Sequence, residues 1–525
     1  ADAYGCFPGH STQQADAEQA YIQAELIGPE TWVAIPPEAW PAEWHAKGYI
    51  RPVCRLKKAL YGHPDSGSSW ERHCDKALKA GGYTPVNNWP SRYFHKRLKL
   101  FLTVYVDDFK LSGPVENLTA GWDLIRGKGI VLDPPTDLGH YLGCEHERKT
   151  VKLPDGKTAN AVVYNMEDYL TSCVDRYQDM CKETTGKNVV LKVVPTPFTH
   201  EDHKESDAGR PNMPGPCSEC PWCKHTFPFT GKAHVFSSAS AGTGASNAKE
   251  GSAELGATLG GEVSQAEYDE AVSSIKTALA SIAAKPKSKG GKKKKKGIVN
   301  RIEEDRGELQ PLAASVLMKI LYAASMARFD LLRPTVWLAR YLTKWTTECD
   351  QKLHRLVSYI NCSKNLRQIG YIGNLPKDLS LDVYADADFA GDIPSQRSTT
   401  GVHLCLEGSN SYFPLTGVCK RQGCISCSTP EAEMVSGHLA YKNVMIPTYD
   451  LWDALLPGGY TANFHEDNQA MIRIVETGRN PTMRHIGRVH RISVRWLHER
   501  LGNPETKDRC RIFYEDSANM RADIY

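Results

Sequence analysis

Two adjacent aspartates, Asp107 and Asp108, interrupt an apolar segment whose composition is typical of a β-hairpin. Residues 98–106 are rich in β-prone side chains, and residues 109–111 resume the pattern after the two acids. Two carboxylates at one tight turn repel each other, and a bound divalent cation removes this repulsion. The pair therefore indicates phosphoryl or nucleotidyl transfer by two metal ions, which lie about 4 Å apart in such sites.

Asp16 is the candidate for the third carboxylate that such a site normally needs. It precedes a helix-prone stretch, residues 17–26, and we expect it where a strand enters that helix. Each signal has an ordinary structural alternative. An Asp-Asp pair is common in a solvated turn, and a single Asp before a helix often caps it.

A second set of acids lies in the C-terminal part of the chain. Asp386 falls on an alternating strand, and Glu431 falls in the first turn of a helix that Ser428 and Pro430 begin. The full set is Asp386, Glu431, Asp467 and Asp523, with Asp388 and Glu433 nearby. These four carboxylates are expected to converge on one two-metal site that hydrolyses phosphodiesters. Helix capping by Asp467 and surface solvation of Asp523 are the alternatives.

The elements around these acids divide the chain by pattern. Residues 1–199 have the aromatic residues, apolar runs and turn signals of a folded domain. Residues 200–307 are rich in Ser, Ala, Gly and Lys, which predicts a disordered, low-complexity insertion with one short helix at 264–284. Apolar residues at helical spacing predict two or three packed helices within 308–372, and alternating strands and helices predict an α/β domain at 373–525.

Several motifs in order resemble known proteins. Segments 14–22, 55–62, 104–108 and 137–143 resemble the reverse transcriptase of copia-type retrotransposons, and Lys57-Lys58-Ala59-Leu60-Tyr61-Gly62 is the most specific block. Segments 384–391, 397–401, 428–433, 466–470 and 484–486 look like the RNase H of the same Pol polyproteins. The resemblance implies an α+β polymerase palm with a partial thumb, joined by a helical tether to an α/β RNase H-like domain.

The resemblance also implies the site residues and the activity. Metal-binding acids would be Asp16, Asp107 and Asp108 in the polymerase, and Asp386, Glu431, Asp467 and Asp523 in the RNase H, each set holding Mg²⁺ or Mn²⁺. The implied function is RNA-directed DNA synthesis coupled to degradation of RNA in RNA:DNA hybrids. Its partners would be an RNA template, a DNA primer, the hybrid, dNTPs and other Pol or Gag products, in the cytoplasm, in virus-like particles or in the nucleus.

Two departures favour a different class of function, a decayed or repurposed fragment that binds nucleic acid without turnover. Asp65 stands where the family has a neutral amide near the nucleotide. Only 15 residues precede Asp16, so we expect the fingers to be largely missing and the chain to be a fragment or processed product. The intact acids favour chemistry, and RNase H activity is expected to survive better than polymerisation.

A cysteine cluster within 200–307 allows a zinc site. Cys217, Cys220, Cys223 and His225 supply four soft or borderline ligands within nine residues, the number that tetrahedral zinc takes. Free thiols in a flexible insertion are the alternative. The nearby tract Lys292–Lys296 suits nonspecific phosphate contact, nuclear import or a solvated linker.

The length, composition and net charge exclude several classes of protein. A chain of 525 residues with 41% hydrophobic content can bury two or three cores. A net charge of +3 is too small to indicate a nucleic-acid partner by itself, because phosphate binding depends on clustered Lys and Arg. The sequence has no apolar run of about 18 residues and no signal peptide, which predicts a soluble, intracellular protein with no membrane partner.

Overall fold

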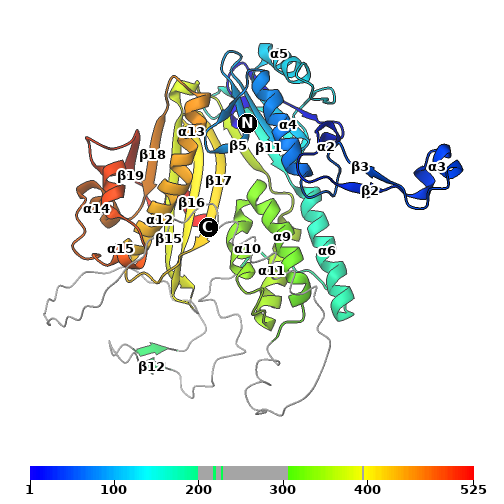
Figure 1. Cartoon of the computed structure of the whole chain (residues 1–525). Coiled ribbons are helices and arrows are strands. Elements are labelled where there is room, and N and C mark those ends of the chain that lie inside the picture. The colour runs from blue at the N-terminus through cyan, green and yellow to red at the C-terminus, as the bar shows by residue number, and fades with distance from the viewer. Residues whose placement is uncertain (199–216, 220–225, 229–305, 393–394) are drawn as a thin grey trace. The chain divides into compact units, whose positions relative to one another are not determined.

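The computed structural model describes residues 1–198, 217–219, 226–228, 306–392 and 395–525 (Figure 1). The chain divides into two compact units, one of residues 1–198 and 294–525 and the other of residues 199–293. In the second unit, β12 (Cys217–Glu219) pairs antiparallel with β13 (Thr226–Pro228). The predicted helix at 264–284 and the lysine tract lie outside the described residues. The first unit has a mixed α/β architecture.

A six-stranded antiparallel sheet carries the first pair of acids. Its strands, in spatial order, are β4 (Thr84–Val86), β5 (Trp89–His95), β6 (Leu100–Tyr105), β7 (Asp108–Pro114), β1 (His10–Asp16) and β8 (Thr136–Asp137). The predicted hairpin around Asp107 is confirmed as β6 and β7. Helices α4 (Ser66–Ala80) and α5 (Val115–Arg126) pack on this sheet through Trp70, Leu78 and Trp122, which are all buried with Phe109.

The helix predicted over residues 17–26 is shorter than expected. Only α2 (Ala20–Gln23) forms, because backbone groups beyond it pair with a distant segment. Leu26 N–H donates to the Lys57 carbonyl at 3.0 Å, and Ala59 N–H donates to the Ala24 carbonyl at 3.0 Å. Tertiary pairing here overrides local helix propensity.

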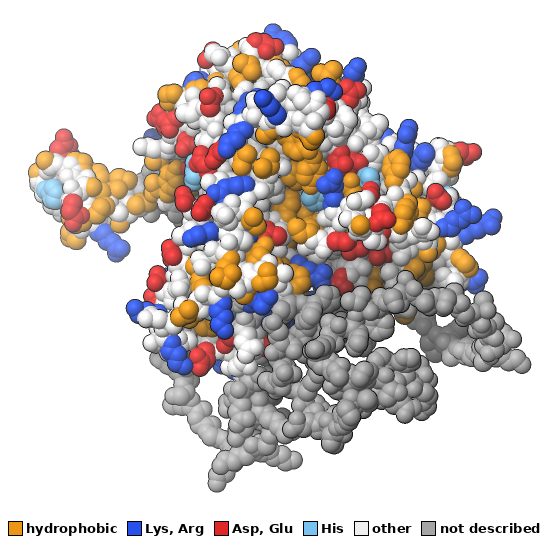
Figure 2. Space-filling view, turned by 180° about the vertical axis from the view of Figure 1, so that it is seen from behind, with side chains coloured by type: hydrophobic (Ala, Val, Ile, Leu, Met, Phe, Trp, Pro, Cys, Tyr) orange, Lys and Arg blue, Asp and Glu red, His pale blue; other side chains and the backbone are white. Residues whose placement is uncertain are grey.

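An arm projects from the six-stranded sheet between α2 and α4. It contains β2 (Trp32–Ala34), α3 (Ala42–Ala46) and β3 (Val53–Arg55), and β2 pairs antiparallel with β3. Ile50 is 93% exposed on it, and Trp32 and Val53 are also exposed. Figure 2 shows hydrophobic side chains gathered along this arm, at the left of the view.

A nine-stranded sheet carries the second set of acids. Its spatial order is β19 (Cys510–Tyr514), β18 (Thr461–Glu466), β15 (Ser380–Asp392), β16 (Arg397–Gly408), β17 (Ser411–Arg421), β14 (Gln368–Ile372), β11 (Thr158–Asn165), β10 (Cys144–Lys152) and β9 (His140–Tyr141). β18 is parallel to both β15 and β19, and the other pairs are antiparallel. The boundary predicted at residue 372 therefore falls inside one continuous sheet.

Helices predicted between residues 308 and 372 are present as α9 (Gln310–Met326), α10 (Leu332–Ala339) and α11 (Thr347–Ser363). Helices α9 and α11 pack on α6 (Glu167–Thr185), and α10 packs on α9, α11 and β17. The C-terminal part adds α12 (Thr429–Leu439), a π-helix (Ala440–Met445), α13 (Ile446–Leu455), α14 (Gln469–Thr477), α15 (Ile486–Val489), α16 (Val494–Leu497) and a final 3-10 turn (Arg521–Ile524). None of the described helices is long and apolar enough to cross a membrane.

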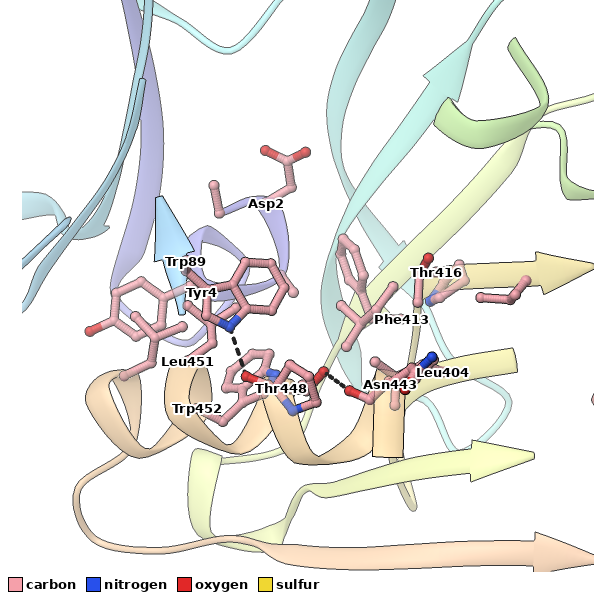
Figure 3. Close-up of a pocket in the computed structure, with 18 of the residues that line it drawn as sticks. Asp2, Tyr4, Trp89, Leu404, Phe413, Thr416, Asn443, Thr448, Leu451 and Trp452 are labelled. Carbon is pink, nitrogen blue, oxygen red and sulfur yellow. Dashed lines mark hydrogen bonds between the residues drawn. The ribbon is translucent and has the colours of Figure 1, made fainter. Parts of the chain in front are cut away.

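The two sheets also meet through side chains around a cavity of about 530 Å³. Trp89 of β5 lies over α13 and donates from its indole Nε1 to the Pro447 carbonyl at 2.7 Å (Figure 3). Asn88 donates from Nδ2 to Asp450 Oδ2 at 2.6 Å beside it. The cavity is lined mainly by apolar groups of the N-terminal segment, β17 and α13, and it contains none of the predicted metal-binding acids.

Candidate active sites

The register of β1 and β7 brings the first three acids together. Asp16 is directly opposite Asp108, at the ends of the two strands. Asp107 belongs to the turn that precedes β7, and its carbonyl accepts a hydrogen bond from Ala17 N–H at 2.8 Å. Asp16 thus ends a strand as predicted, and the hairpin turn holds the other two acids beside it.

Val106 shapes the turn at a cost in backbone strain. Its φ is 54°, in the left-handed region that β-branched residues rarely adopt. Trp70 Nε1 donates to the Val106 carbonyl at 2.6 Å, and Trp70 itself is buried in α4. A strained turn persists only where surrounding structure holds it, and this bond is one such contact. The arrangement presents Asp107 and Asp108 at the end of the sheet.

The carboxylates in this cluster repel one another. Burial, followed by the negative charges of Asp16 and Asp107, raises the pKa of Asp108 to about 6. A group of carboxylates that repel each other is a site whose ionised form a divalent cation would stabilise. The oxygen-only donor set fits Mg²⁺ or Mn²⁺.

The second cluster joins three elements of the nine-stranded sheet region. Asp386 comes from the middle of β15, Glu433 from α12, and Asp467 from the residue directly after β18. One carboxylate oxygen from each of the three lies within 4.8 Å of the other two. Ser436 Oγ, one turn along α12, donates to the Asp386 carbonyl at 2.7 Å and ties the helix to the strand. The three acids therefore occupy a small, braced volume.

Burial and mutual repulsion raise the pKa values of these acids. Burial, then the charges of Asp523 and Asp467, raises the pKa of Asp386 to about 7. Burial, then the charges of Asp386 and Asp467, raises the pKa of Glu433 to about 9. The Glu433 Oε2 atom is buried and has no hydrogen-bond partner among the described residues. An unpaired buried carboxylate oxygen beside other acids fits a cation site.

Asp523 and Asp388 take different positions. Asp523 belongs to the final 3-10 turn, which contacts β15, and its pKa is raised by burial and then by the charge of Asp467. Asp388 instead forms an ion pair with Arg333 of α10. Asp467 accepts a hydrogen bond from Ser517 Oγ at 2.6 Å, and it does not cap α14. Asn468 caps that helix, with its side chain accepting from Met471 N–H.

The structure corrects the placement of Glu431. Glu431 is in the first turn of α12 as predicted, but its carboxylate turns away from Asp386 and accepts from Cys427 N–H at 3.0 Å. Successive helical residues point about 100° apart, so Glu433, two positions on, faces β15 in its place. Burial alone would raise the pKa of Glu431, but the Cys427 N–H and His485 outweigh it and lower the pKa.

Glu466 is a residue of this cluster that the sequence argument missed. It is 0% exposed, its Oε2 atom has no described hydrogen-bond partner, and burial followed by the charge of Glu433 raises its pKa. A signal was present in the sequence. Ala462, Phe464 and Glu466 alternate along β18, and this spacing places Glu466 on the same buried face as the two apolar residues.

The predicted zinc ligands Cys220, Cys223 and His225 lie outside the described residues. Cys217 begins β12, and only its backbone is described. This predicted site therefore stays a prediction.

Comparison with curated proteins finds similarity over most of this chain. The chain is 21% identical over 432 residues to the "Retrovirus-related Pol polyprotein from transposon TNT 1-94" of Nicotiana tabacum, a match that covers 81% of this chain and 23% of the relative. The chain thus spans about a quarter of the length of that relative. No protein-family model matches.

Among solved structures, RNase H1 from the archaeon Halobacterium salinarum NRC-1 aligns with 27% of this chain and 90% of its own, at 13% identity and a TM-score of 0.19. A superposition this loose assigns no fold by itself. The sequence match extends over most of the chain and shows that it is similar to part of a retrovirus-related Pol polyprotein.

Proposed function

We propose that the Asp386 cluster hydrolyses the RNA strand of an RNA:DNA hybrid with two bound Mg²⁺ or Mn²⁺ ions. The observation that carries the proposal is the convergence of Asp386, Glu433 and Asp467 within 4.8 Å from three separate elements. The relation to a Pol polyprotein supports a nucleic-acid substrate. The buried, unpaired Glu433 oxygen supports a cation as the missing partner.

Each acid would have a defined part in this reaction. Asp386 lies on β15, which is paired with β16 and β18, and would be one of the ligands that hold the ions. Glu433 and Asp467 would hold the ions with it, and the exposed Asp523 would complete the ligand set. The ions, when bound, activate the attacking water and stabilise the leaving oxygen. Fixing the four acids on strands and helix starts keeps them in place before substrate arrives.

The test is cleavage of a labelled RNA:DNA hybrid by the full chain with Mg²⁺ or Mn²⁺. We expect the unmutated chain to cleave the RNA strand and Asp386→Asn to lose at least about 100-fold in rate while still binding the hybrid. Asp453→Asn makes the same chemical change at a surface ion pair with Arg509 and should leave the rate unchanged. Hybrid binding without cleavage by the unmutated chain would instead support a nucleic-acid-binding fragment without turnover.

We propose nucleotidyl transfer at the first cluster as a second function, within a polymerase palm that the helices α9 to α11 tether to the RNase H-like part. The observation that favours it is the pairing of Asp16 with Asp108 across β1 and β7, beside the turn that holds Asp107. Such a site would add dNTPs to a DNA primer on an RNA template. The arm formed by β2, α3 and β3 projects beside this sheet and is the described surface best placed to contact a template.

Primer extension on an RNA template tests this second function separately. Asp108→Asn should abolish any extension, and Asp123→Asn, an exposed residue of α5, should not. Extension that is unchanged in Asp108→Asn would exclude the first cluster. Because the two assays use different acids, one activity can fail without the other.

A further inference from the structure

Four side chains of types that bind metal ions gather around the first turn of α12: Cys427, Glu431, His485 and His490. Cys427 lies in the loop between β17 and α12, and Glu431 lies in the first turn of α12. His485 directly precedes α15, and His490 directly follows it. Two segments about 55 residues apart in sequence thus meet at one carboxylate, since His485 and Glu431 are 54 positions apart.

The distances within this group are short. His485 Nε2 lies 3.2 Å from each Glu431 carboxylate oxygen, and His490 Nε2 lies 2.9 Å from Glu431 Oε1. The Cys427 thiol sulfur, one Glu431 oxygen and one His485 ring nitrogen all lie within 4.8 Å of one another. Tetrahedral zinc with bonds of about 2.0–2.3 Å separates its ligand atoms by roughly 3.3–3.8 Å. The Cys427 sulfur therefore has to approach by up to about 1 Å. The two histidine nitrogens, now 2.9–3.2 Å from Glu431 oxygens, have to move apart from them slightly.

Two of the four side chains are buried, and the other two are accessible to solvent. The Glu431 side chain is 1% exposed and the His490 side chain 2%, so both are fixed by packing. Cys427 is exposed, and the His485 side chain is 42% exposed, which leaves one side open to solvent. A carboxylate held between two imidazoles is anchored in advance.

We propose that Cys427, Glu431, His485 and His490 form a zinc site, separate from the two carboxylate clusters. A thiolate and two imidazoles are soft or borderline donors, which favour Zn²⁺ and disfavour the Mg²⁺ that suits the oxygen-only clusters. One thiolate and one carboxylate balance the charge of the ion. His490 contacts the group through Glu431 and would turn onto the ion as the fourth ligand, so that protein groups take all four positions, as in structural zinc sites.

The ion would act as a brace. It would join the start of α12, which carries Glu433 two residues after Glu431, to the segment around α15. The ordinary alternative is a Glu431 carboxylate hydrogen-bonded to the two histidines, in which the Cys427 thiol has no part. Only the zinc site requires a bond from Cys427 to an ion, so this cysteine distinguishes the two accounts. This inference does not depend on hybrid cleavage, because metal content and spectra are measured without substrate.

The experiment is Co²⁺ substitution in the purified full chain, with Cys217, Cys220 and Cys223 all changed to Ser so that the other cysteine cluster cannot contribute. Excess Mg²⁺ occupies the carboxylate clusters. We expect one Co²⁺ per chain with a thiolate-to-cobalt absorption band and the visible spectrum of tetrahedral cobalt, both displaced by Zn²⁺. Zinc should also raise the Tm of this protein.

Cys427→Ser should remove the thiolate band and weaken zinc binding by at least about 10-fold. Cys424→Ser is the matched control, because that thiol lies in the same loop and donates to the Val489 carbonyl instead. His485→Gln should weaken binding without removing the thiolate band, which keeps the test valid if one variant misfolds. A thiolate band that survives Cys427→Ser, or no stoichiometric binding in the folded parent protein, would overturn the proposal.

Discussion

Glu431 and Glu433 are two residues apart on α12, yet their carboxylates serve different groups: Glu433 lies with Asp386 and Asp467, and Glu431 lies between His485 and His490. Both residues are acids near the start of the helix, so their position in the sequence does not decide which one joins the Asp386 cluster. Their side-chain directions decide between them.

The first prediction uses this difference. Glu433→Gln should lower hybrid cleavage by at least about 100-fold, because it removes a carboxylate from the proposed two-metal site. Glu431→Gln should lower it by less than about 10-fold, because Glu431 acts only through the position of α12. Steady-state cleavage of a labelled hybrid measures both. Equal losses in the two variants would contradict the assignment.

Glu466→Gln should behave unlike Glu433→Gln. Burial beside Glu433 keeps Glu466 protonated, so an uncharged amide of the same shape changes little. We expect cleavage within about 10-fold of the unmutated chain, and a Tm close to that of the unmutated chain in the absence of divalent ions. Thermal unfolding with a chelator, run beside the cleavage assay, checks both. A loss as large as that of Glu433→Gln would make Glu466 a metal ligand.

Stability without divalent ions should fall with rising pH because of Asp386. The pKa of this group is raised in the folded chain from 3.8 to about 7, so its protonated form is favoured by folding. Its contribution is fully present below pH 3.8 and is lost as the pH rises through about 7. The Tm advantage of Asp386→Asn should therefore grow across that window, and Mg²⁺ should reduce it. A pH-independent advantage would refute the coupling.

The Val106 turn gives a prediction on stability. Val106→Gly should raise the free energy of unfolding by about 0.5–1 kcal/mol, because glycine accepts a φ of 54° without strain. Val131→Gly is the control, an exposed valine outside the left-handed region, and should lower it by a similar amount. Urea unfolding measures both. If both variants lose stability equally, Val106 stores no strain.

Trp70→Phe tests the contact that holds the same turn. Removing the indole N–H leaves the Val106 carbonyl without its donor, and we expect a loss of about 1–3 kcal/mol in the free energy of unfolding. Trp44→Phe, on the projecting arm, should cost less than about 0.5 kcal/mol. Primer extension, if present, should fall in Trp70→Phe while hybrid cleavage stays unchanged.

Local pattern was enough to predict much of the fold. The apolar run before Asp107 gives a hairpin, and the helical spacing after Leu309 gives α9 to α11. Alternation places Asp386 on a strand and Asp467 just after one. Each of these features depends on neighbouring residues in the sequence, so the sequence contains the information directly.

What the sequence could not supply depends on contacts between distant segments. The helix expected after Asp16 is cut short because residues 24–26 pair with residues 57–59. The choice between Glu431 and Glu433 depends on which side of α12 packs on β15. The continuous sheet joining β11 to β14 depends on strands more than 200 residues apart, as in the pairing of Asn160 with Ile372.

That last ladder has a consequence for the integrity of the chain. The strand β11 precedes residues 199–293 and β14 follows them, so hydrogen bonds and helix packing join the two flanks independently of the peptide link. The segments before and after residues 199–293 are therefore held together by non-covalent contacts within the first unit. A protease nick within the intervening unit should leave both halves bound as a complementing pair, and the paired acids of each site would stay whole, since neither cluster draws residues from both halves.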